Sequence, residues 1–292
     1  MVSGRSGRTV GARRAGRWLG RAGLAVAYAA VALFFVVPLW WALAGSLTPL
    51  DRVFAHLAPF DLRALWPAHP TLEAYRQLFG RHAFARVLLN TAFVALATVA
   101  TGLVVNGLAG FAFAVLRFRG KRVLFVIALV SAMVPAEALA IPLFQLVGQL
   151  GLLDSYAALI APAVSNGMAV FLFRQFFAEI PVEISEAARI DGASWLTILL
   201  RLYVPLSLPV TIAAGLLLFV FQWESFLWPL IAVHSQRYTV IQIALSNLQQ
   251  QHSTQWTQIF AASTLASLVP LLLLLPLQRF YVQGIVSSGV KG

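Results

Sequence analysis

Long apolar runs dominate this chain, and short polar or charged stretches separate them. The runs occupy residues 22–47, 87–116, 123–148, 157–177, 206–232 and 258–280. Each run approaches or exceeds the ~20 residues with which an α-helix crosses a hydrocarbon core of ~30 Å. The period-two alternation of apolar and polar residues that marks a membrane β-barrel is absent from them. The pattern therefore predicts an all-α, polytopic membrane protein with six transmembrane helices.

The stretches between the runs set the organisation that we expect. Residues 1–21 form a basic amino terminus, 22–47 the first transmembrane helix, 48–86 an extracytoplasmic loop, 87–280 a transmembrane core with a cytoplasmic loop at 178–205, and 281–292 a tail. The first run exceeds the roughly 7–15 apolar residues of a cleavable signal peptide, so we expect it to be retained. In the first outer loop, TLEAYRQLF from Thr71 predicts a short helix.

The positive charges predict which side of the membrane each loop occupies. With six spans both termini lie on one side, and that side holds fifteen of the 21 Lys and Arg residues. The other side holds six, which are Arg52, Arg63, Arg76, Arg81, Arg86 and Arg237. Because cytoplasmic loops carry the excess of Lys and Arg, both termini and the loop 178–205 are predicted to be cytoplasmic.

Composition narrows the function classes. Only 11% of the residues are charged, against roughly 25% in soluble domains. The net charge of +11 does not indicate nucleic-acid binding, because the cations lie at the ends of apolar runs and not on a polar, aromatic-lined surface. The chain has no cysteine, which excludes disulfides and thiolate chemistry. Its five histidines match no metal-ligand spacing. We therefore expect no catalytic residue, no metal site and no bound cofactor.

The cytoplasmic loop 178–205 is unusual because four of the ten acidic residues lie within thirteen residues of it. Pro181 suits the first position of a helix, and Gly192 suits a left-handed stop. Ser194 suits the cap of a second helix that ends at Leu202. The first helix is too short to span a membrane, and its small and apolar residues favour a docking element over a merely solvated linker.

The same loop resembles a known signature. EAARIDGA from Glu186, with LYVP nine residues beyond Gly192, is similar to the pattern EAA-x3-G-x9-I-x-L-P, with Leu202 and Val204 in place of Ile and Leu. That pattern marks permease subunits of bacterial binding-protein-dependent ABC importers. Other stretches resemble the smaller, six-span permease of carbohydrate importers of the maltose-transporter type: SLTP, LLNT, RFRGKR, IPLF, LGLLDSY, FLFRQFF, FLWPL and QRFYVQGIVSSGVKG.

This resemblance implies a MetI-like ABC importer permease fold in the bacterial inner membrane. The partners that it implies are a second permease subunit in a heterodimer, a dimer of ATPase subunits, an extracytoplasmic solute-binding protein and membrane lipid. The coupling helix of such permeases sits in a cleft of the ATPase, and the residues that we assign to it are Glu183, Glu186, Ala187, Ala188, Asp191 and Gly192. Similar tails also reach the ATPase, so the tail from Val282 is a second candidate contact. No Walker A motif occurs here, so ATP and Mg²⁺ are expected to act on the partner ATPase.

Polar residues at membrane depth are the candidates for a substrate path. We assign to it Glu137, Asn166, Gln222, Trp223 and Glu224. Aromatic faces stack on sugar rings, while amides and carboxylates bond hydroxyl groups; alternatively, these residues hydrogen-bond neighbouring helices or lie near an interface. Asn106, which lies among glycines, is expected to pack. The family commonly has Asn where this chain has Glu224.

Several substrates and mechanisms are compatible with this pattern. A sugar or oligosaccharide is favoured by the resemblance, while glycerol-3-phosphate or another small polar solute is the alternative. No Lys or Arg lies deep in a predicted span, which favours a neutral glycan over a phosphate. From a different class, a proton-coupled secondary carrier remains the competitor, although such a carrier has no need of an ATPase-docking loop.

Overall fold

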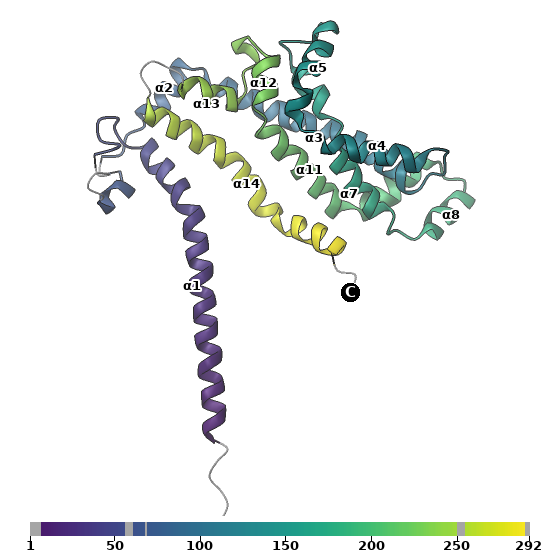
Figure 1. Cartoon of the computed structure of the whole chain (residues 1–292), viewed down its shortest axis with the longest axis horizontal. Coiled ribbons are helices and arrows are strands. Elements are labelled where there is room, and N and C mark those ends of the chain that lie inside the picture. The colour runs from purple at the N-terminus through teal and green to yellow at the C-terminus, as the bar shows by residue number, and fades with distance from the viewer. Residues whose placement is uncertain (1–6, 56–60, 68, 250–254, 290–292) are drawn as a thin grey trace, which may run out of the picture. The chain divides into compact units, whose positions relative to one another are not determined.

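A computed structural model describes residues 7–55, 61–67, 69–249 and 255–289 (Figure 1). Within these ranges every regular element is a helix. The start of the basic amino terminus (1–6), the last residues of the tail (290–292), His56 and His252 lie outside the described residues. The chain forms two compact units, Met1–Gln77 with Gln255–Ser267, and Leu78–Thr254 with Leu268–Gly292.

The smaller unit is built on helix α1 (Gly7–Ser46), the turn η1 (Leu62–Leu65), the start of α2 (Glu73–Arg81) and the first part of α14 (Trp256–Gly289). Trp40 Nε1 donates to the carbonyl of Leu65 at 2.9 Å. Gly45 faces Phe260 of α14 so closely that a Cβ would lie 2.6 Å from a ring carbon. Glycine at position 45 therefore allows α1 and α14 to approach each other. The predicted short helix of the outer loop is α2, which begins two residues after Thr71.

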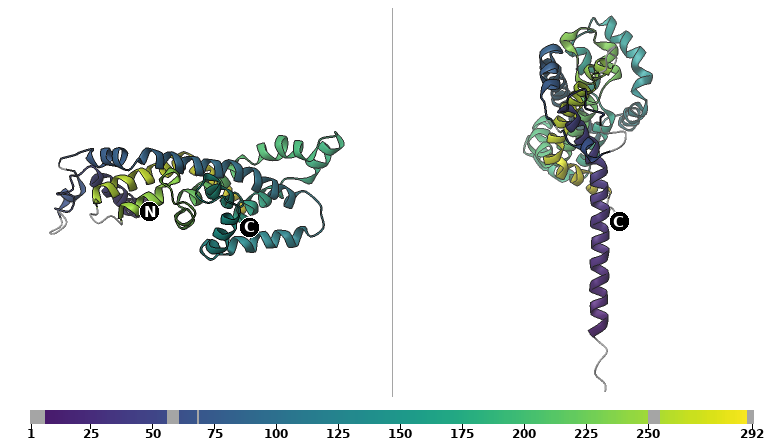
Figure 2. Two further views of the ribbon diagram at one scale, coloured as in Figure 1. Left: turned by 90° about the horizontal axis from the view of Figure 1, so that it is seen from above. Right: turned by 90° about the vertical axis from the view of Figure 1, so that its left-hand side faces the viewer.

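The larger unit contains most of the helices. They are α3 (Phe84–Ala114), α4 (Lys121–Met133), α5 (Ala136–Gln149), α6 (Tyr156–Ile160), η2 (Ala161–Ala163), α7 (Gly167–Phe177), α8 (Val182–Ile190), α9 (Trp195–Ile198), the π-helical η3 (Leu199–Tyr203), α10 (Val204–Leu206), α11 (Leu208–Trp223), α12 (Leu227–Ala232), η4 (Gln236–Tyr238) and α13 (Ile241–Gln249). Within this unit α8 and α13 lie at opposite ends (Figures 1 and 2). The start of α3 is hydrogen-bonded to η4, and its end packs against η3. Helix α3 therefore extends from one end of the unit to the other.

The count of six spans agrees with the structure when each bent helix pair is taken as one span. Within the described ranges, three segments are long and apolar enough by themselves, namely Gly23–Ser46, Phe84–Ala114 and Trp256–Leu277. Three further spans are the bent pairs Lys121–Met133 with Ala136–Gln149, Tyr156–Ala163 with Gly167–Phe177, and Trp195–Leu206 with Leu208–Trp223. The fold is the all-α, polytopic one that the apolar runs predict.

Two of the predicted spans are nevertheless wrong in one respect, because neither forms a single continuous helix. The run 123–148 is not one straight helix, because the chain turns by 103° between α4 and α5. Val134 is extended there, with ψ of 124°, as a proline at the next position favours. The run 206–232 is also not one helix, because α11 ends at Trp223 and α12 is separate. The helical segment that forms a bent pair with α11 instead precedes α11, and the two meet at 86° around Ser207.

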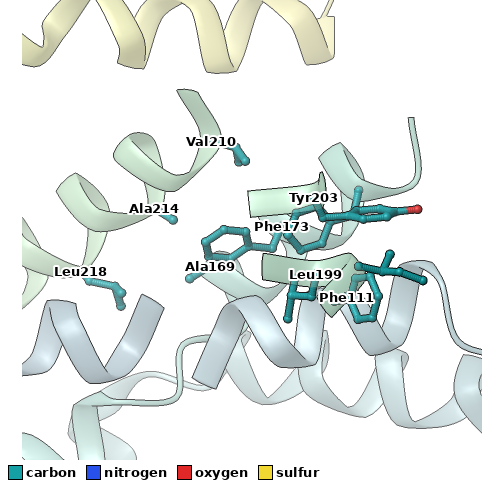
Figure 3. Close-up of a cluster of buried hydrophobic side chains, with 10 residues drawn as sticks. Phe111, Ala169, Phe173, Leu199, Tyr203, Val210, Ala214 and Leu218 are labelled. Carbon is teal, nitrogen blue, oxygen red and sulfur yellow. The ribbon is translucent and has the colours of Figure 1, made fainter. Parts of the chain in front are cut away.

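Helices α3, α7 and α11 pack together and hold the core of the larger unit. Buried residues from all three, with others from α9 and η3, form one cluster: Phe111, Ala169, Phe173, Phe177, Ile198, Leu199, Tyr203, Val210, Ala214 and Leu218 (Figure 3). We call this set the aromatic core. The rings of Phe111, Phe173 and Tyr203 gather at one end of it, while the small side chains of Ala169 and Ala214 let α7 and α11 approach α3.

Gly110 provides a test of this close packing. A Cβ at Gly110 would clash with the Cβ of Phe173 and lie 3.0 Å from the backbone nitrogen of Arg174. A Cβ at Gly107, one turn earlier, would meet only the ring tip of Phe173 at 3.9 Å. We expect Gly110→Ala to lower the free energy of unfolding by about 1–3 kcal/mol through overpacking. Thermal unfolding of the purified protein in detergent, with Gly107→Ala as the matched control, measures this; equal melting temperatures would contradict the packing.

Candidate functional site

The acidic segment of the loop forms helix α8, which the structure delimits sharply. Pro181 has φ of −55° and ψ of 131°, so it lies just before the helix. The prediction that Pro181 is the first helical residue is therefore wrong. Glu183 lies in the first turn and Arg189 in the last, where their charges complement the helix dipole. The Ala193 amide donates to the carbonyl of Ala188 at 2.9 Å, and Gly192 has φ of +82°. The predicted left-handed stop is therefore confirmed.

The second helix of the loop begins as predicted and ends later than predicted. The Ser194 side chain accepts the Thr197 amide at 3.2 Å. The chain then stays helical beyond Leu202, through the π-helical turn η3 and α10 to Leu206. Pro205 offers no N–H to the carbonyl of the preceding turn, and a local π-helical adjustment can satisfy the backbone groups that a proline frees in a membrane helix.

One hydrogen bond attaches α8 to the aromatic core. Ser185 and Tyr203 share a 2.7 Å hydrogen bond between their hydroxyl groups, and each residue is only 1% exposed. The Tyr203 ring packs edge-to-face against Phe111 at 5.0 Å and Phe177 at 5.4 Å. Because Phe111 belongs to α3 and Phe177 to α7, Tyr203 connects α8 with both of these helices.

The outward surface of α8 consists largely of the residues assigned to coupling. Five of the six, Glu183, Glu186, Ala187, Asp191 and Gly192, are exposed. Ala188 is half-buried and packs against the aromatic core. Ile190 is 87% exposed, a large fraction for an aliphatic side chain. The surface is braced by Arg189, whose guanidinium lies 5.0 Å above the Trp195 ring and donates to the Ala193 carbonyl at 2.8 Å.

The sequence reasoning missed Ser185 and Tyr203. Ser185 lies three residues before Ala188, so helical spacing puts both on one face, which is the buried one. That spacing was the available signal. Nothing in a single sequence shows that Tyr203, eighteen residues away, is its partner.

The residues assigned to a substrate path differ in their hydrogen bonds and in their exposure. Asn166 caps α7, because its side-chain oxygen accepts the Ala169 amide at 3.0 Å. The backbone N–H of Asn166 donates to the side-chain oxygen of Asn106 at 2.9 Å. Asn106 is fully buried and donates to the carbonyls of Gly102 and Val164 at 2.7 and 2.8 Å. This network ties α3 to the break before α7, so Asn106 and Asn166 hold helices together.

The other four assigned residues differ in exposure. Gln222 is 8% exposed and Trp223 is 3% exposed. The Trp223 ring stacks on Phe219 with a centroid distance of 5.3 Å, so its face is already occupied. Glu224, just after the end of α11, and Glu137, in the first turn of α5, are both exposed. Of the assigned set, Glu137 and Glu224 are the two side chains in the exposed class.

Asp154 organises the far end of the larger unit. It lies in the turn after α5 with φ of 55°, and its carboxylate accepts the amides of Ser235 and His234 at 2.9 and 3.0 Å. The Ser235 amide, with that of His234, holds the pKa of Asp154 below its ordinary value of 3.8. A depressed pKa means that the carboxylate stabilises the fold above pH 3.8, and that this contribution is lost as pH falls through the lower native pKa.

We expect Asp154→Ala to free the amides of His234 and Ser235 and to speed their hydrogen exchange severalfold. Asp154→Asn is the matched control, because an amide oxygen still accepts both hydrogen bonds and Asn tolerates positive φ. Hydrogen-exchange mass spectrometry of the segment 232–236 measures the effect. Acidification should loosen this segment in the wild type, whereas it should leave Asp154→Asn unchanged. Equal exchange in all three proteins would contradict the role of Asp154.

The described residues contain no group of three or more His, Cys, Asp or Glu that could hold a metal ion.

Comparison with known proteins decides the family. A family model described as "Binding-protein-dependent transport system inner membrane component" matches residues 106–287. The chain belongs to this family. It is a multi-pass membrane permease subunit of the ABC importer type, a transport subunit and not an enzyme.

Curated relatives and solved structures agree with this family. The arabinooligosaccharide transport system permease protein AraQ of Bacillus subtilis (strain 168) is 30% identical over 93% of this chain and 96% of its own length. The lactose transport system permease protein LacG of Rhizobium radiobacter is 34% identical over 69% of this chain and 74% of its own. The sn-glycerol-3-phosphate transport system permease protein UgpE of Rhizobium meliloti (strain 1021) is 34% identical over 70% and 73%.

A solved bacterial ABC transporter involved in the import of the acidic polysaccharide alginate superposes with a TM-score of 0.76 at 23% identity, over 96% of this chain and 99% of that one. At this identity the likeness shows the fold alone. The MetI-like permease fold expected from the loop signature is thereby confirmed.

Proposed function

We propose that this chain is one of two permease subunits of an importer for a neutral sugar or oligosaccharide, driven by ATP that a separate pair of ATPase subunits hydrolyses. A second permease, the ATPase pair and an extracytoplasmic solute-binding protein complete the assembly. The observation that carries the proposal is α8, a short exposed helix whose single buried face is bonded to the core of the transmembrane bundle.

The geometry of α8 suits the transmission of movement. Its outward face is exposed and free to fit a partner, and its inward face ends on Ser185. From Tyr203 the aromatic core continues into α3 through Phe111 and into α7 through Phe177. The same residue ends η3, which leads through α10 into α11. A displacement of α8 by the ATPase would therefore move three core helices together.

Topology supports the placement of α8 in the cytoplasm. The segment that carries α8 and the segment near α13 lie at opposite ends of the larger unit. Fifteen of the 21 cations fall on the side of α8 and both termini when the six spans are threaded in order. Because positive charge is retained in the cytoplasm, both termini and α8 are cytoplasmic and α13 is extracytoplasmic.

Charge on the helices favours a neutral glycan over a phosphate ester. Helices α5 and α11 contain no Lys or Arg, and the exposed acidic side chains at their ends are Glu137 and Glu224. Arg or Lys groups are the usual partners of phosphate, whereas carboxyl oxygens accept hydrogen bonds from the hydroxyl groups of sugars. Oligosaccharide transport by the relatives AraQ and LacG is compatible with this chemistry.

The binding-protein partner has support from a second likeness. A structure of the alginate transporter in complex with an alginate pentasaccharide-bound periplasmic protein superposes with a TM-score of 0.60. Loops at the α13 end of the present chain would receive such a protein. The extracytoplasmic ends of α5 and α6 are joined there to the segment after α12 through Asp154.

The experiment is reconstitution of this chain with its co-purifying subunits in proteoliposomes, together with the solute-binding protein of the same system. We expect uptake of a radiolabelled neutral oligosaccharide that requires ATP inside the vesicles and is not competed by sn-glycerol-3-phosphate. Preferential uptake of the phosphate ester would overturn the substrate class. Uptake that survives ATP depletion and collapses with the proton gradient would overturn the ATP-driven mechanism in favour of a secondary carrier.

A further inference from the structure

A basic cleft lies at the cytoplasmic end of the larger unit. It has a volume of about 300 Å³ and is lined by Phe113, Lys121, Arg122, Phe125 and Arg174. The residues come from the end of α3, the start of α4 and the last turn of α7, so the three helices meet at this point. We call this set the basic cleft.

Two of the three cations in the basic cleft are held in place. Lys121 Nζ donates to the carbonyls of Leu116 and Ala114 at 2.9 and 3.0 Å. The Arg174 guanidinium lies 5.0 Å above the Phe125 ring. Such contacts lower the entropy that these long side chains would lose on binding an anion. Arg122 is exposed at the edge.

No carboxylate in the described part of the chain forms an ion pair with these cations. Among the residues that the structure describes, the ion pair found joins Arg52 and Asp51, far along the chain from the cleft. Three like charges thus converge on one small volume without an ion-pair partner among the residues that the structure describes. An anion of fixed position would relieve their mutual repulsion and accept several charge-assisted hydrogen bonds.

The surroundings of the cleft are apolar on the α4 side. Leu124 and Val126 flank Phe125 and are each 49% exposed, and Val123 is 63% exposed. A ligand that fits both features has an anionic group and an apolar chain. The cleft also lies where membrane helices end, which is the depth of lipid headgroups.

We propose that the basic cleft binds the phosphate of an anionic phospholipid, with an acyl chain along the exposed apolar side chains of α4. The bound lipid ties together the cytoplasmic ends of α3, α4 and α7. A free phosphate shares the headgroup chemistry and lacks the acyl chain, so the two sources are separable. The proposal does not depend on which solute the transporter carries.

The test uses the full-length chain with its co-purifying subunits, in nanodiscs of phosphatidylcholine with or without phosphatidylglycerol. Native mass spectrometry counts the phosphatidylglycerol retained after gentle extraction. We expect Arg122→Gln to weaken retention roughly fivefold, and the double variant Arg122→Gln/Arg174→Gln to weaken it further, because each cation near an anionic lipid contributes on the order of 1 kcal/mol. Arg122→Lys should retain most of the binding.

Arg119→Gln is the matched control, since Arg119 is an exposed cation of the same loop that does not line the cleft. Equal loss of retention in Arg119→Gln and Arg122→Gln would overturn the site in favour of diffuse attraction. Displacement of phosphatidylglycerol by millimolar inorganic phosphate would overturn the lipid as the source of the anion. Because Arg122→Gln leaves the Arg174–Phe125 contact intact, unchanged retention in that folded variant would also overturn the proposal.

Discussion

Gly192→Val is expected to reduce ATP-driven uptake about tenfold or more while the chain still inserts and assembles. Gly192 has φ of +82°, and no atom lies within 4 Å of the position that a Cβ would take. The cost is therefore backbone strain alone, about 1–3 kcal/mol for a residue forced into this region, and it is high for a β-branched side chain. Relief of that strain shifts the end of α8, and with it the surface offered to the ATPase.

Two controls separate coupling from general damage. Gly151 also has positive φ, at +66°, with no atom within 4 Å of its Cβ position, but it lies in the turn after α5, which we propose to be extracytoplasmic. Gly151→Val should therefore cost similar stability and leave ATP-coupled uptake closer to wild type. Gly192→Asn should retain most of the uptake, because Asn tolerates the left-handed region. Uptake and ATP hydrolysis are measured together in proteoliposomes. Loss in Gly151→Val as large as in Gly192→Val would contradict a role specific to α8.

Tyr203→Phe is expected to lower both uptake and thermal stability, although it removes a single oxygen atom. The substitution keeps the ring contacts with Phe111 and Phe177 and deletes the 2.7 Å hydrogen bond to Ser185. It leaves the Ser185 hydroxyl, which is 1% exposed, without its phenol partner. A buried polar group left unpaired costs about 1–3 kcal/mol. The cost falls on the attachment of α8, so uptake should decline more than ATP hydrolysis does.

The double variant Ser185→Ala/Tyr203→Phe sharpens this prediction. Removing both hydroxyl groups leaves no unpaired partner, so the double variant should be more stable than Tyr203→Phe alone. Melting temperatures in detergent and uptake rates in proteoliposomes give the two readouts. Additive losses from the two single substitutions would mean that Ser185 and Tyr203 do not act as a pair, and the attachment of α8 would then rest elsewhere.

Local signals in the sequence predict the structure of the loop 178–205 well, because its turns depend on neighbouring residues. Glycine is the residue that adopts positive φ without strain, so Gly192 marks the end of α8. Ser194 caps the next helix through the amide three residues later. The apolar runs likewise predict the spans, since a hydrocarbon core requires about 20 apolar residues in a helix.

Bends and partners were harder to predict. Pro38, Pro142, Pro270 and Pro276 lie inside continuous helices, whereas Pro135 lies in the break at the 103° bend between α4 and α5. Membrane helices tolerate proline because neighbouring helices satisfy the freed groups, so a proline in the sequence does not by itself show a break. The contacts of Asn106 with Asn166, and of Ser185 with Tyr203, join residues 60 and 18 positions apart. A single sequence contains no record of such pairs.

Site-specific cross-linking from α8 tests the central claim most directly, and a chain without cysteine suits it. Ile190→Cys places one thiol on a side chain that is 87% exposed at the end of α8, and Trp66→Cys places one on a side chain that is 66% exposed in the first outer loop. With a short thiol-to-amine cross-linker, Ile190→Cys should join this subunit to the ATPase in high yield, and Trp66→Cys should not. Docking of α8 on the ATPase is contradicted if Ile190→Cys gives no ATPase adduct in the assembled transporter, or if Trp66→Cys gives an equal one.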